Sequence, residues 1–223
     1  MSTNRFTILF SALIVATCGQ SILLAGPDAN GRVSVDYVAE ILPRGIDMLD
    51  EREIERYQEI VDMGAEAHPA LREIMKESDD PFLISRILGI FARSAGDKTV
   101  AIEAIRELLA RDELPDNFAT IVVRTTSAEV LGLIGRTGDA VIVYPLLVDN
   151  SERVRVYAVR AIARIGGPHD KQHLKAVFEE RRNKLSQDEF QRDMTSQEIE
   201  KAIGLIRDKH LPVKDGQRSD VQE

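Results

Sequence analysis

The stretch DNSERVRVYAVRAIARIG, residues 149–166, decides the fold. It opens with Asp149 and Ser151, residue types that cap helices, and its apolar residues then recur at helical spacing up to Gly166, where a helix can end. A second stretch of the same kind, DPFLISRILGIFARSAGD, occupies residues 80–97, and a third, RTTSAEVLGLIG, occupies residues 124–135. The sequence therefore predicts one helical unit used three times.

An arginine sets the alignment of the three copies, at Arg86, Arg124 and Arg155. These arginines stand 38 and 31 residues apart, within the range of helical repeats. The third residue after each arginine is small, which lets a neighbouring helix approach closely: Gly89, Ser127 and Ala158. The middle copy departs from the pattern, because Asp116 lies eight residues before its arginine and the other copies have a spacing of six.

Helix start signals occur along the rest of the chain, and the alternation of apolar and polar residues that marks strands is absent. The signals are capping boxes, prolines at a first helical position and Gly-Asp pairs. They lie at Asp50–Glu53, Pro69, Gly96–Asp97, Pro115–Asp116, Gly138–Asp139, Pro168, Ser186–Glu189 and Thr195–Glu198. We therefore expect an all-α protein.

The Asp-x-x-x-x-x-Arg start, the alanine-rich helix and the closing Ile-Gly resemble the HEAT-like repeat, in the variety first described in phycobilisome lyases. The resemblance covers about residues 64–180. It implies a right-handed α-solenoid, an armadillo-like stack of three to four helix pairs. A repeat domain is expected over residues 64–208, with N-terminal capping helices over 33–62. The motif indicates a fold and carries no activity with it.

The N-terminus reads as a secretory signal peptide over residues 1–25. Arg5 precedes an apolar segment, and no charge follows until Asp28. Two alternatives stay open: an uncleaved membrane anchor, or a lipoprotein in which Cys18 is lipidated. Each places the protein outside the cytoplasm, and Cys18 is the only cysteine.

Composition narrows the class of partner. Hydrophobic residues make up 43% and charged residues 30%, which is ordinary for a folded soluble protein. The net charge of −8 argues against a nucleic acid as the main partner, because phosphate binding needs a basic surplus. The expected partner is a protein, and the membrane is reached only through the N-terminal segment. Residues 209–223 are polar and are predicted to form a disordered tail.

A basic stripe is the candidate binding site. Several arginines fall on the second helices of the predicted pairs, the layer that lines the inner curve of a HEAT stack, where they could dock an acidic protein segment or another anionic polymer. The alternative is that each pairs with an acidic neighbour. Recurrence of Asp80/Arg86 and Asp149/Arg155 favours a structural role for those pairs, with Asp capping its helix and Arg reaching a neighbouring turn. The candidate residues are Arg86, Arg93, Arg124, Arg153, Arg160 and Arg164.

His169 and His173 carry the competing hypothesis, a metal-dependent or lyase-like enzyme. Two histidines four residues apart on a helix share a face and could hold a transition metal. Deoxyhypusine hydroxylase is an iron enzyme built on HEAT repeats, but its ligands come from His-Glu dipeptides and this sequence has none. Phosphate-binding loops and nucleophile elbows are also missing from the sequence. We therefore expect no metal, no cofactor and no catalysis.

Overall fold

The computed structural model describes residues 33–42, 51–111 and 117–209; within them the only regular elements are helices, and there is no β-strand. The prediction of an all-α protein is confirmed. The predicted signal peptide over residues 1–25 and residues 210–223 of the predicted tail lie outside the described residues. Lys209, assigned to that tail, is the last residue of a helix.

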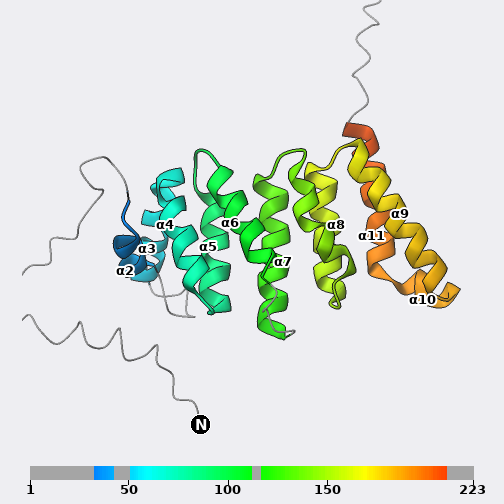
Figure 1. Cartoon of the computed structure of the whole chain (residues 1–223), viewed down its shortest axis with the longest axis horizontal. Coiled ribbons are helices and arrows are strands. Elements are labelled where there is room, and N and C mark those ends of the chain that lie inside the picture. Colours follow the sequence, from blue (N-terminus) through cyan, green and yellow to red (C-terminus); the bar gives the residue numbers. More distant parts are fainter. Residues whose placement is uncertain (1–32, 43–50, 112–116, 210–223) are drawn as a thin grey trace, which may run out of the picture.

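The helices follow one another along the chain with short connections (Figure 1). Most are α-helices of ten residues or more, and two are 3₁₀ helices, labelled η. In order they are α2 (Val35–Ile41), α3 (Glu51–Asp62), η1 (Gly64–Ala67), α4 (His68–Glu77), α5 (Pro81–Arg93), α6 (Thr99–Leu109), α7 (Phe118–Ile134), η2 (Asp139–Val148), α8 (Glu152–Ile165), α9 (Pro168–Lys184), α10 (Gln187–Arg192) and α11 (Met194–Lys209).

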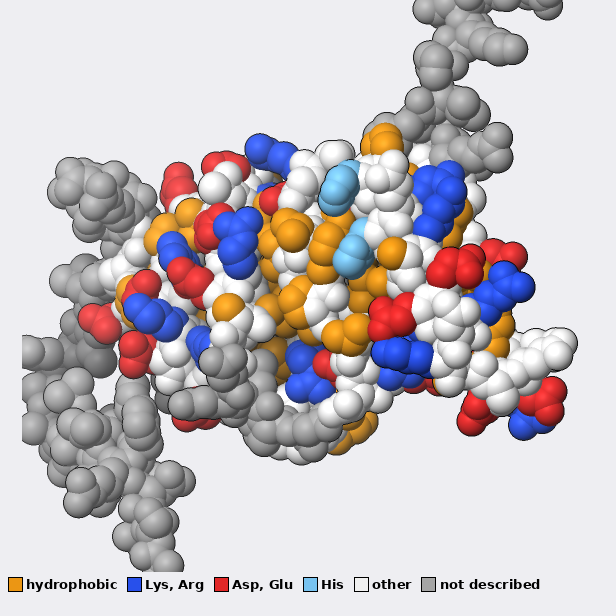
Figure 2. Space-filling model, turned by 45° about the vertical axis from the view of Figure 1, so that its right-hand side comes forward, with side chains coloured by type: hydrophobic (Ala, Val, Ile, Leu, Met, Phe, Trp, Pro, Cys, Tyr) orange, Lys and Arg blue, Asp and Glu red, His pale blue; other side chains and the backbone are white. Residues whose placement is uncertain are grey.

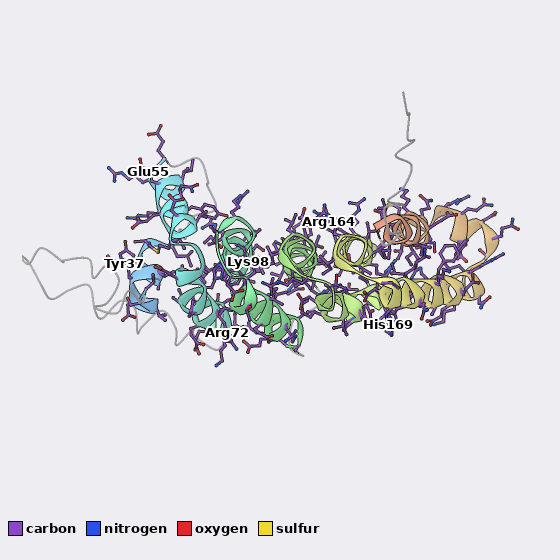
Figure 3. The ribbon with its side chains drawn as sticks, turned by 90° about the horizontal axis from the view of Figure 1, so that it is seen from above. Tyr37, Glu55, Arg72, Lys98, Arg164 and His169 are labelled. Carbon is purple, nitrogen blue, oxygen red and sulfur yellow. The ribbon has the colours of Figure 1, made fainter. Side chains whose placement is uncertain are left out.

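The longer helices lie in two rows, with the apolar core between them (Figure 3). Helices α3, α5, α7, α8 and α11 form one row, in which each packs against the next; we call it the upper row. Helices α2, α4, α6, η2 and α9 form the lower row. Seen from above, the upper row dips at α7 between its two ends, so its outer face curves inward.

Side-chain caps begin α5 and α10 where the sequence predicts them. The Asp80 carboxylate accepts the N–H of Phe82 at 2.9 Å and caps α5. Ser186 and Glu189 form the predicted capping box of α10. The capping box predicted at residues 195–198 is wrong. Helix α11 begins one residue before Thr195, because Asp193 accepts the N–H of Ser196 at 2.8 Å.

Gly135 and Gly166 end α7 and α8, as the repeat pattern predicts. Their φ angles are −71° and −72°, so a left-handed backbone is not what requires glycine. A β-carbon would lie 2.6 Å from the carbonyl oxygen of Leu131 in the first case and 2.5 Å from that of Ile162 in the second. Glycine is needed because the extended backbone after each helix passes close to the last carbonyl oxygens of that helix, where a β-carbon would clash.

Helix η2 is the one element of its row with 3₁₀ geometry over ten residues, which is long for that type. Pro145 lies within it. Proline lacks an N–H and its ring clashes with the carbonyl four residues earlier in an α-helix, so regular α geometry is disfavoured here. Gly138, at φ +106°, turns the chain into it. The predicted helix is present at this position, in a tighter form.

Candidate interaction surface

Helix α8 displays three arginines on one exposed face. Arg153, Arg160 and Arg164 are spaced by seven and four residues, which places them on one side of an α-helix, and all three are exposed. Arg164 lies on the outer side of the upper row (Figure 3). The face therefore belongs to the side of the molecule that curves inward.

Arg160 has partners on this face. Its Nε donates to the Glu198 carboxylate of α11 at 2.9 Å, and its guanidinium lies 5.4 Å from the centre of the Tyr157 ring. The bond to Glu198 raises the pKa of Arg160 against the lowering effect of burial. An ion pair this exposed contributes little stability, so an incoming carboxylate could compete for the guanidinium.

Helix α5 carries the next two arginines of the predicted stripe. Arg86 and Arg93 stand two turns apart on one face of that helix. Arg93 donates from Nη1 to the Tyr57 hydroxyl at 2.6 Å and lies over the Tyr57 ring at 5.6 Å. Gly89 stands between the two arginines, and a β-carbon there would meet the Tyr57 hydroxyl at 3.0 Å. Arg93 thus joins α5 to α3.

Arg124 lies apart from the exposed arginines. Only 13% of its side chain is exposed, and its Nε lies 2.8 Å from the Asp149 carboxylate, which is 10% exposed. Asp149 also accepts the N–H of Ser151 at 2.8 Å. Arg124 therefore joins α7 to the turn that precedes α8.

Arg155 also bonds a turn. It donates from Nη1 to the carbonyl oxygens of Asp149 at 2.7 Å and Asn150 at 3.0 Å, and from Nε to the Thr195 hydroxyl at 3.2 Å. Arg155 therefore bonds the backbone carbonyl oxygen of Asp149, whereas the carboxylate of Asp149 forms an ion pair with Arg124.

His169 and His173 lie on the first turns of α9, at the lower row. The His173 ring stacks on Tyr144 of η2, with centroids 3.9 Å apart and planes at 12°. The Tyr144 hydroxyl donates to the Asp170 carboxylate at 2.5 Å, and burial together with this bond raises the pKa of Tyr144. Figure 2 shows histidine side chains, in pale blue, beside apolar surface. Within the described residues, no three His, Cys, Asp or Glu side chains stand together where they could hold a metal ion.

Sequence reasoning missed a buried polar cluster under the upper row. His68 has no exposed surface, and its Nε2 lies 2.6 Å from the Ser94 hydroxyl oxygen. Lys98 donates to that hydroxyl at 3.2 Å and to the carbonyl oxygen of Phe91 at 2.7 Å, closing the end of α5. His68 and Ser94 are 26 positions apart in the sequence, so no local pattern marks the cluster.

Comparison with models of known protein families, with curated proteins and with solved structures gave no match for this chain. Within the described residues, the helices fall short of the length and apolar character that a bilayer crossing requires.

Proposed function

We propose that this chain is a right-handed α-solenoid of HEAT-like helix pairs that acts outside the cytoplasm as a non-catalytic scaffold or adaptor. The two rows of helices, in which each helix packs against the next helix of its row, support the solenoid. The recurring arginine in three copies, one of which reaches the next copy's first aspartate, supports the repeat. The apolar segment after Arg5 supports export.

The observation that carries the binding role is the row of exposed arginines on α8. Arg153, Arg160 and Arg164 face outward on the side that curves inward. Tyr157 lies among them, half-buried. Arginine and tyrosine together are typical of binding hot spots, because both offer hydrogen bonds and a flat apolar surface. We call these four residues the α8 arginine face.

An acidic protein segment is the partner that suits the α8 arginine face. The chain's net charge of −8 repels such a partner at long range, but salt screens charges beyond about 8 Å at physiological ionic strength. Bidentate contacts between guanidinium groups and carboxylates then decide binding at short range. Arg86 and Arg93 lie on α5, a helix of the same row.

The test is affinity capture of partners from the native host with the tagged protein. The variant carries Arg153→Gln, Arg160→Gln and Arg164→Gln together. We expect the wild type to retain a defined acidic partner and the triple variant to lose at least about tenfold of it, since each charged contact contributes on the order of 1 kcal/mol.

The control removes three exposed positive charges from the other row, with Lys76→Gln, Arg106→Gln and Lys175→Gln. It changes the net charge by the same amount and should leave capture intact. Equal capture by wild type and the α8 triple variant would show that the α8 arginine face does not bind the partner. Equal loss in both variants would show an effect of net charge alone.

A further inference from the structure

An open groove lies at the end of the molecule, where α9, α10 and the start of α11 meet the first turn of α8. It holds about 420 Å³ and is lined by three arginines, four carboxylates and one leucine. Figure 2 shows acidic and basic side chains mixed over the right-hand end of the molecule, where α9 and α10 lie. The groove shares no residue with the α8 arginine face.

Three of the four carboxylates are already occupied by donors of the protein: Glu189 accepts from the N–H and hydroxyl of Ser186 at 2.9 and 2.7 Å, and the other two, Asp193 and Glu152, are bound at the start of α11. Asp193 accepts from Arg181 at 2.9 and 2.6 Å and from the N–H of Ser196 at 2.8 Å. Burial alone would raise the pKa of Asp193, but these bonds outweigh it and hold the pKa at about 2. Glu152 accepts the N–H of Met194 at 3.0 Å. Asp193 and Glu152 therefore hold the start of α11 in place.

Arg155 is bound differently on the groove floor. Its Nε and Nη1 donate to a hydroxyl and to two carbonyl oxygens, all uncharged acceptors. Within the described residues, its Nη2 has no hydrogen-bond partner. Burial, and then the neighbouring Arg181, lower the pKa of Arg155, and together they outweigh the raising effect of Asp193, Glu152 and Asp149. The floor of the groove thus offers a half-buried cation with a donor left over, which a carboxylate would satisfy.

The rim of the groove limits what else the ligand can carry. Asp188 and Glu189 on α10 are exposed and acidic, and they would repel a run of acidic residues. A single carboxylate followed outward by a basic residue meets less repulsion, because the basic residue is the part that faces Asp188 and Glu189. Leu185, half-buried in the lining, offers apolar contact to one side chain. A peptide that ends in an apolar residue, with its free carboxylate, has this combination of groups.

We propose that the groove binds the C-terminal carboxylate of a partner chain, with Arg155 as the anion-binding residue. Leu185 contacts the last side chain, and Asp188 favours a lysine or arginine upstream. This site goes beyond the proposed binding role of the α8 arginine face, since it recognises a chain end.

Fluorescence anisotropy with a labelled peptide tests the assignment. The probe is fluorescein-Gly-Gly-Lys-Ala-Leu, with a free C-terminal carboxylate or as its C-terminal amide. We expect the full-length protein to bind the amide at least about tenfold more weakly, because the amide lacks the charge. Arg155→Gln should remove this difference, and Asp188→Asn should weaken binding of the carboxylate form about two- to threefold. Arg182→Gln, on an exposed arginine of α9 outside the groove, is the matched control and should change nothing.

Equal affinity for the two peptides, or no binding of either up to millimolar protein, would overturn the proposal. The comparison uses the wild type, so it stands even where Arg155→Gln lowers stability. Displacement by sodium acetate at the peptide's own concentration would show a site for any carboxylate and overturn the assignment to a chain end. The α8 triple variant should bind the free-carboxylate peptide as the wild type does, which separates failure of this site from failure of the α8 arginine face.

Discussion

At the scale of single residues, His68 shows how burial sets a pH dependence. It contacts Ser94 through Nε2, and its Nδ1 has no hydrogen-bond partner within the described residues. Burial lowers the pKa of His68 to about 4, with a further contribution from Lys98. The folded state therefore keeps the imidazole neutral where the unfolded chain, with a pKa of 6.5, takes up a proton.

We expect the free energy of unfolding to fall as the pH drops from 6.5 to 4, and to be independent of this group above 6.5. Because the unfolded state binds the extra proton, acid favours unfolding. The pKa difference corresponds to a loss of about 3 kcal/mol at pH 4. Urea titrations at several pH values measure it.

His68→Gln should lose most of this pH dependence, since glutamine can bond Ser94 without titrating. His169→Gln, on an exposed histidine of α9, is the control and should follow the wild type. Parallel pH curves for the wild type and His68→Gln would show that His68 is not held neutral by the fold.

At the scale of elements, the contact between α7 and α8 depends on a glycine. Gly132 is buried in the middle of α7, and a β-carbon there would lie 2.9 Å from the Cα atom of Ala161. A backbone atom cannot move aside as a flexible side chain can. The two helices approach closely because neither has a bulky side chain at this point.

We expect Gly132→Ala to lower the free energy of unfolding by about 1–3 kcal/mol, through overpacking against α8. Helix propensity alone would raise it by about 1 kcal/mol. Gly204→Ala in α11 provides the comparison, because a β-carbon there meets nothing within 4 Å and the residue is exposed. That variant should be stabilised. Thermal unfolding of both variants measures these changes in stability. Stabilisation by Gly132→Ala would contradict the close approach of α7 and α8.

The elements were predicted from sequence where local chemistry determines them. Asp80 caps α5 and Gly166 ends α8 through contacts within a few residues, so their patterns are readable. The start of α11 was misplaced because Asp193 bonds both Ser196 and the distant Arg181. The 3₁₀ geometry of η2 is not predicted, since the Gly138–Asp139 signal marks where a helix starts and not which type of helix follows.

The candidate sites were predicted less completely, because they depend on contacts between distant helices. The arginines of α8 share a face by spacing alone, and this was readable. The ion pair of Arg124 with Asp149 joins residues 25 positions apart. The sequence around Asp149 does not indicate which arginine binds its carboxylate. The groove around Arg155 forms only when three helices and a turn pack together, so no local sequence pattern predicts it.

At the scale of the whole molecule, stacking makes the surfaces possible. Each helix of the upper row packs on the next helix of that row, so the row presents a continuous outer face. The groove forms where the row ends, because α10 and the start of α11 close the last pair differently from the others. A stack of this kind can be altered at one surface without loss of the rest.

The measurement that tests the stack most directly is the distance between its ends. Spin labels at Glu55→Cys on α3 and Glu200→Cys on α11, in a chain with Cys18→Ser, report it by pulsed electron resonance; both sites are exposed. Four helix-to-helix steps of 8–10 Å separate α3 from α11, so we predict about 32–40 Å between the labels. A distance below about 20 Å would mean that α3 and α11 are neighbours in a closed bundle, and would contradict the solenoid.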